Sequence, residues 1–189
     1  MAVASCEVGR GVPILLRLAI CNPLSATGEG RLLHIANELR VDVLLLSGTG
    51  IRARKDESYD TWTLGEGNYT VFSWGYRASS RGSNKAAGVA IILGPRFKGA
   101  SVTEVLSPPD DIQGRAGALR LKTGCQDLLP IVGYPPPISG KGQIKADQIF
   151  AHDSTISWLQ KTANKAPLRT VPIIAGDLNV RMGSTSEVR

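Results

Sequence analysis

The chain has 189 residues, which is enough for one domain with a substantial core. A composition of 42% hydrophobic and 20% charged residues excludes a disordered chain and indicates a soluble globular protein. The formal net charge of +6 favours polyanionic partners such as nucleic acid, although a solvated basic surface explains the same charge equally well.

The sequence contains no segment that predicts a membrane span or secretion. Residues 12–20 form the longest early apolar stretch, but this stretch is short and carries Arg17. Cys6, Cys21 and Cys125 match no zinc spacing, so we interpret them as reduced thiols. We therefore expect an intracellular protein, nuclear or cytoplasmic, without a membrane partner.

The first half of the chain predicts alternating strands and one helix. Residues 1–11 are expected to form a loose leader, and the weak alternation over residues 13–20 predicts a strand. Apolar residues at i, i+3, i+4 and i+7 within 31–40 predict an amphipathic helix. The continuous apolar run 41–46 predicts a strand that is buried on both faces. The polar segment 56–67 is expected to be a loop.

The second half predicts more strands and a longer helix. Mixed helical spacing predicts a helix over residues 146–163. Because each helix connects strands, we expect a single sheet-based α/β domain over residues 12–189, with its helices outside. Apolar runs or alternating segments, bounded by glycine and proline, predict strands at 69–74, 86–93, 116–122, 127–134 and 171–175.

The most informative motif is Gly176-Asp177-Leu178-Asn179, which follows an apolar run. On an extended backbone, residues i and i+2 point to the same face, so Asp177 and Asn179 are expected to converge just past a strand end. A carboxylate and an amide directed at one point suit a hard cation, an attacking water or a phosphate.

Several segments follow one another in a particular order along the chain: 18–22, 41–46, 88–93, Gly114-Arg115, 132–136 and 176–179. This order resembles the endonuclease/exonuclease/phosphatase family, and is most similar to non-LTR retrotransposon endonucleases and apurinic-type DNA repair nucleases. The resemblance implies an α/β (α+β) four-layer sandwich of two mainly antiparallel β-sheets with outer helices. It also implies hydrolysis of phosphodiesters with Mg²⁺ (or Mn²⁺), with DNA as the leading partner.

The resemblance implies a role for each candidate site residue. Asp177 corresponds to the catalytic acid that positions or deprotonates the attacking water, and Asn179 to an amide that orients phosphate or water. Asn22 corresponds to a residue at the metal end of the site, and Tyr134 to a phenol that contacts the scissile phosphate. Arg115 is either a phosphate contact or a structural cation. Turn capping for Asp177, Asn179 and Asn22, and closure of a core edge for Tyr134, remain the alternatives.

Two departures from the family pattern predict an impaired enzyme. The position of the principal magnesium-ligand glutamate is occupied by Gly48, so binding of the metal is expected to be weak. The family's C-terminal Asp-His pair has no counterpart before Arg189, so we expect the last strands to be missing and the domain to be incomplete. The alternative is an inactive relic that binds nucleic acid or protein. Whether the substrate is DNA, RNA, a lipid headgroup or an inositol phosphate stays open, as does the oligomeric state.

Aromatic and basic residues outside this motif series have simpler explanations. Trp62, Trp74 and Trp158 are interpreted as core residues rather than as platforms for stacked bases. Lys161 and Lys165 lie near a helix end, where the helix dipole favours cations without any nucleic acid.

Overall fold

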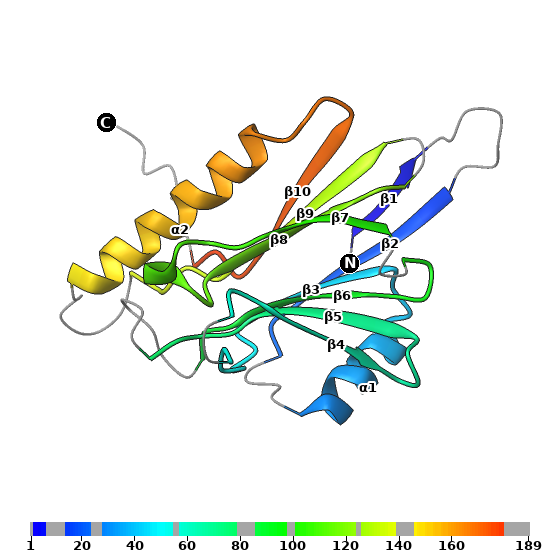
Figure 1. Ribbon diagram of the computed structural model, residues 1–189, viewed down its shortest axis with the longest axis horizontal. Helices are drawn as coiled ribbons and strands as arrows, with labels where there is room; N and C mark the ends of the chain where they lie inside the picture. The colour runs from blue at the N-terminus through cyan, green and yellow to red at the C-terminus, as the bar shows by residue number, and fades with distance from the viewer. Residues whose placement is uncertain are drawn as a thin grey trace, which may run out of the picture.

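The computed structural model describes residues 2–6, 14–23, 28–54, 57–78, 86–97, 101–123, 126–138 and 146–179. Two β-sheets lie face to face, and one helix covers the outer face of each sheet (Figure 1). This arrangement confirms the expected four-layer α/β sandwich with mainly antiparallel sheets.

The first sheet has the strand order β1-β2-β3-β6-β5-β4. All of its neighbouring strands are antiparallel except β2 and β3, which run parallel because helix α1 (Glu29–Leu39) connects them. The strands are β1 (Ala2–Cys6), β2 (Ile14–Cys21), β3 (Val43–Ser47), β4 (Asp60–Leu64), β5 (Tyr69–Trp74) and β6 (Val89–Leu93).

The second sheet has the strand order β10-β9-β8-β7. Strands β9 and β10 run parallel because the long helix α2 (Ala146–Asn164) returns the chain between them. A short 3₁₀ helix, η2 (Asp110–Ile112), precedes β8. The strands are β7 (Val102–Leu106), β8 (Ala116–Leu121), β9 (Asp127–Gly133) and β10 (Thr170–Gly176).

Strand β3 is an apolar run without alternation because both of its faces pack against apolar clusters. Val43 and Leu45 pack between the two sheets, in the same cluster as Trp74. Leu44 and Leu46 belong to the cluster on the other face, beneath α1. The strand is therefore buried on both faces, as its sequence predicted.

Helix α2 covers the second sheet through a separate apolar cluster. Leu159 packs in this cluster with Ala118 of β8 and Ile131 of β9. In the described part of the chain, no helix is long and apolar enough to cross a membrane.

Three strands were not predicted, and all three lie at the edges of sheets. Strand β1 pairs only with β2, so the expected loose leader is wrong for Ala2–Cys6. Strand β4 occupies Asp60–Leu64, within the segment expected to be a loop. Strand β7 (Val102–Leu106) carries exposed Thr103 and Glu104. An edge strand pairs on one side only and tolerates polar residues, so it lacks a strong hydrophobic signal.

The two-sided burial of β3 leads to a prediction about stability. Leu45 is 0% exposed and Leu168 is 96% exposed, so the same truncation tests opposite environments. We expect Leu45→Ala to lower the free energy of unfolding by about 2–5 kcal/mol and Leu168→Ala by less than about 0.5 kcal/mol. Urea unfolding followed by circular dichroism measures both values, and equal effects would contradict the described packing.

Candidate active site

The topology brings several strand ends to one edge of the sandwich. Strands β2 and β3 are parallel, and so are β9 and β10, so each pair ends at a common edge. We call the residues that directly follow these four strands the strand-end rim. They are Asn22 after β2, Gly48 after β3, Tyr134 after β9 and Asp177 after β10.

Two hydrogen bonds join the two sheets at the strand-end rim. Asn22 Nδ2 donates to Asp177 Oδ2 over 3.0 Å, although the two residues are 155 positions apart in the chain. The backbone N–H of Asp177 donates to Ser47 Oγ over 3.3 Å. Asn22 and Asp177, which sequence analysis selected separately, are thus in direct contact.

Ser47 is a site residue that sequence analysis missed. Its side chain is 1% exposed, and its hydroxyl accepts the hydrogen bond that fixes the backbone of Asp177. The one sequence signal is that this hydroxyl ends an otherwise apolar run. Such a residue is also typical of an ordinary turn, so the pattern alone did not identify it.

Gly176 determines where Asp177 leaves the sheet. Its φ is +139°, a conformation that L-residues with side chains rarely adopt, and a Cβ atom there would collide with the carbonyl oxygen of Gly133. Only glycine allows β10 to approach β9 this closely at the end of the pair. The direction of the Asp177 side chain therefore depends on the glycine before it.

Asn179 orients the Asp177 carboxylate through its backbone rather than through its amide. The N–H of Asn179 donates to Asp177 Oδ1 over 3.3 Å. Asn179 has φ +49°, and its Nδ2 donates to the carbonyl oxygen of Pro135 over 2.8 Å. The chain is therefore not extended here, and the expected convergence of the two side chains from an extended strand is replaced by a turn.

Tyr134, a residue of the strand-end rim, is in contact with the buried Arg115. Arg115 is 1% exposed, its Nη1 donates to the Tyr134 carbonyl over 3.3 Å, and its guanidinium lies 5.7 Å from the centroid of the Tyr134 ring. Burial lowers the pKa of the Arg115 guanidinium to about 10, and the charge interaction with Tyr134 opposes this lowering. This burial favours the structural role for Arg115, in which it positions Tyr134.

Gly48 occupies the position where the resemblance places a metal-binding glutamate. Its φ is +70°, and a Cβ atom there would lie 2.9 Å from Asn22 Oδ1. Asn22 is held in place by its hydrogen bond to Asp177. A side chain at position 48 would therefore displace Asn22 from its place in the strand-end rim.

The described residues of the rim do not fit a magnesium centre. Mg²⁺ requires anionic oxygen ligands, and Asp177 is the one carboxylate among the rim residues, with each of its oxygens accepting a hydrogen bond. Within the described ranges, no group of three His, Cys, Asp or Glu residues gathers. Glu66 lies in the β4–β5 turn, at the opposite end of the first sheet. The assignment of Asn22 to a metal end remains a prediction.

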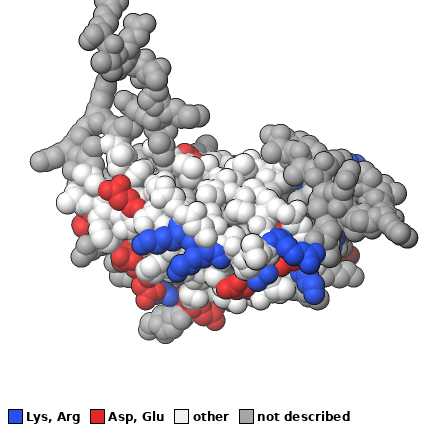
Figure 2. Space-filling model, turned by 90° about the horizontal axis from the view of Figure 1, so that it is seen from above, with Lys and Arg blue, Asp and Glu red and all other residues white. Residues whose placement is uncertain are grey.

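Basic residues do not form one continuous field on the face shown in Figure 2, where Lys and Arg alternate with Asp and Glu. Arg54 pairs with Asp60 over 3.3 Å, and Arg77 pairs with Asp110 over 2.8 Å. Three further basic residues, Lys55, Arg81 and Lys85, lie outside the described residues.

Comparison with known proteins identifies the fold. The sequence matches no family model and no curated protein. Among solved structures, the chain is similar to the AP endonuclease LMAP from Leishmania major, with 14% identity over 87% of this chain and 55% of that chain and a TM-score of 0.57. It is also similar to the APE2 catalytic domain of Xenopus laevis, with 14% identity, coverage of 87% and 59%, and a TM-score of 0.56.

A third similar structure is D. rerio TDP2 complexed with a single-strand DNA product, with 17% identity, coverage of 88% and 61%, and a TM-score of 0.51. The chain thus spans less than two thirds of the length of these three proteins. At such identities the likeness establishes the fold alone. The chain has the fold of the endonuclease/exonuclease/phosphatase nucleases, and the closer likeness to retrotransposon endonucleases remains a prediction.

The contact between Gly48 and Asn22 leads to a second prediction about stability. We expect Gly48→Ala to lower the free energy of unfolding by about 2–4 kcal/mol, because it combines left-handed strain of about 1–2 kcal/mol with displacement of Asn22. Gly67→Ala is the matched control, because Gly67 has φ +83° but nothing within 4 Å of its Cβ position. Denaturant unfolding of both variants separates the two contributions.

The difference between these variants should disappear when Asn22 is first replaced by alanine. Equal losses for Gly48→Ala and Gly67→Ala in the presence of Asn22 would contradict the described contact.

Proposed function

We propose that this chain is an endonuclease-type phosphodiester hydrolase domain that acts on DNA and whose cleavage step is impaired. The observation that carries the proposal is the contact between Asn22 and Asp177, which joins the ends of two sheets at one rim. The fold, shared with AP endonucleases and with a TDP2 bound to a DNA product, supports this reading. The net charge of +6 is favourable for a polyanionic substrate.

We assign to Asp177 the role of positioning the attacking water. A carboxylate offers about four lone-pair directions, and the hydrogen bonds from Asn22 and Asn179 use two of them. The remaining directions can accept a hydrogen bond from water while the carboxylate keeps a fixed orientation. The phenol of Tyr134 would donate a hydrogen bond to the phosphate, and Arg115 would keep Tyr134 in position.

Impairment follows from the composition of the rim. With Gly48 in the position of the expected glutamate, Asp177 is the one carboxylate that the rim residues contribute. A single carboxylate binds a divalent cation weakly, so little of the charge that develops on the phosphate is neutralised. The same observation favours a second candidate function, an inactive module that binds DNA without cleaving it.

A nicking assay tests the proposal. With supercoiled plasmid and Mg²⁺ or Mn²⁺, we expect slow nicking that Asp177→Asn reduces by about 10²- to 10⁴-fold, the usual contribution of general base catalysis. Binding of the same DNA in EDTA should be almost unchanged, because Asp177 contributes no cation to the phosphate backbone.

The two candidate functions give different results in this assay. DNA binding without nicking by the folded parent chain would favour the inactive module. Absence of DNA binding by the parent chain would contradict both, and nicking unaffected by Asp177→Asn would contradict the role given to that residue.

A further inference from the structure

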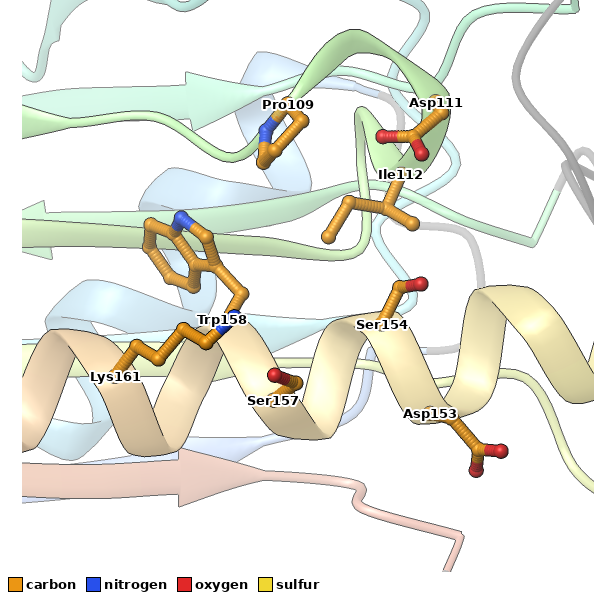
Figure 3. A pocket seen from close by; sticks show the side chains of 8 residues that line it. All are labelled: Pro109, Asp111, Ile112, Asp153, Ser154, Ser157, Trp158 and Lys161. Atoms are coloured by element: carbon orange, nitrogen blue, oxygen red, sulfur yellow. The ribbon is translucent and has the colours of Figure 1, made fainter.

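A hollow of about 500 Å³ lies between helix α2 and the 3₁₀ helix η2 (Figure 3). This volume is within the range of ligand pockets, which is about 300–1,000 Å³. The hollow is connected to the strand-end rim through Arg115, whose N–H donates to the carbonyl of the lining residue Ile112 over 3.0 Å and whose Nη1 donates to the Tyr134 carbonyl over 3.3 Å. Its lining residues are Pro109, Asp111, Ile112, Asp153, Ser154, Ser157, Trp158 and Lys161.

The wall that α2 contributes is not the face that packs on the sheet. The helix buries Ala151, His152, Thr155 and Leu159. The hollow instead receives Ser154, Ser157, Trp158 and Lys161, which follow the i, i+3, i+4, i+7 spacing of a second stripe. This stripe presents hydroxyl, indole and ammonium groups to the hollow, and Trp158 also packs against the cluster beneath α2.

Trp158 stands between two hollows. On the side toward the carboxyl end of α2, a second hollow of about 380 Å³ is lined by Trp158 together with Lys165, Arg120 and Glu104. Trp158 is partly buried against the cluster beneath α2, so its indole is held in place while part of it faces open space. A rigid aromatic ring with space beside it is suited to stacking with a planar group.

The charges that line the hollow are separated. Lys161 and Trp158 lie at one end, and Asp111 and Asp153 lie at the other (Figure 3). Lys165 is one helical turn beyond Lys161, which places the two Cβ atoms about 5–6 Å apart. The basic end therefore suits a chain of phosphates beside an aromatic ring, and the acidic end accepts hydrogen bonds and repels phosphate.

We call the stripe of α2 that carries Ser154, Ser157, Trp158 and Lys161 the flank of α2. We propose that this flank binds single-stranded nucleic acid that continues from the strand-end rim. One base stacks on Trp158, and Lys161 and Lys165 contact the phosphates beside it. The inference rests on the proposed function, because it assumes that a nucleic acid occupies the rim.

The acidic end of the hollow gives the flank a preference among bases. Cytosine and adenine carry exocyclic amino groups that donate hydrogen bonds, whereas thymine has a carbonyl oxygen at the equivalent position. Asp111 accepts from such an amino group and disfavours the carbonyl oxygen. The flank therefore prefers oligo(dC) over oligo(dT).

Fluorescence anisotropy with labelled dC8 and dT8 in EDTA measures this binding without cleavage. We expect the chain to bind dC8 more tightly than dT8, and Asp111→Asn to reduce the difference. Trp158→Leu, which keeps an apolar side chain in the cluster, should weaken dC8 binding about 5- to 100-fold, and Trp158→Phe should change it by less than about 3-fold.

The salt dependence provides an independent test on exposed residues. Lys161→Ala should reduce the slope of log K against log salt by about 0.7, the value for one phosphate contact with a single strand. Lys122→Ala is the matched control, because Lys122 is exposed and lines neither hollow. The control should leave the slope unchanged.

The proposal is overturned if the parent chain does not bind dC8, or if Trp158→Leu and Lys161→Ala bind as the parent does. It is also overturned if Lys122→Ala changes the slope as much as Lys161→Ala. Octamer binding that depends on Trp158, in a chain that does not nick plasmid, would contradict the hydrolase proposal and support this one.

Discussion

The hydrogen bond from Asn22 to Asp177 is the interaction on which the candidate site depends. It connects the end of β2 in one sheet with the end of β10 in the other, and both side chains are half-buried. Neither sheet alone contains the site, because each contributes one partner. Asp177 is further held by Ser47 from β3, and Asn179 extends the connection to Pro135, beside Tyr134. The relative position of the sheets therefore determines the geometry of the rim.

Two glycines determine which side chains the strand-end rim presents, and they do so in opposite ways. Gly176 is required for the close approach of β10 to β9, and it positions an acid. Gly48 leaves space that Asn22 lies against, and it removes an acid that the resemblance implies. The rim residues contribute a single carboxylate, that of Asp177, and each of its oxygens already accepts a hydrogen bond, so a divalent cation finds few anionic oxygens there.

The sequence predicted the interior of the fold better than its edges. The apolar run that became β3 and the helical spacing within α1 are strong signals because burial dictates them. The edge strands β1, β4 and β7 pair on one side only, so their sequences are under weaker constraint. Asp177 and Asn22 were selected through the resemblance, but their contact required the tertiary structure. Ser47 was not recognised, because a strand-end serine is equally typical of an ordinary turn.

A double-mutant cycle between Asn22 and Asp177 tests the central claim most directly. The free energy of unfolding is measured for Asn22→Ala, for Asp177→Ala and for the double variant. The account predicts a coupling energy of about 1–2 kcal/mol, as expected for a partly buried hydrogen bond to a carboxylate. Effects that add to within about 0.3 kcal/mol would contradict it, because the two sheets would then not be joined at this point.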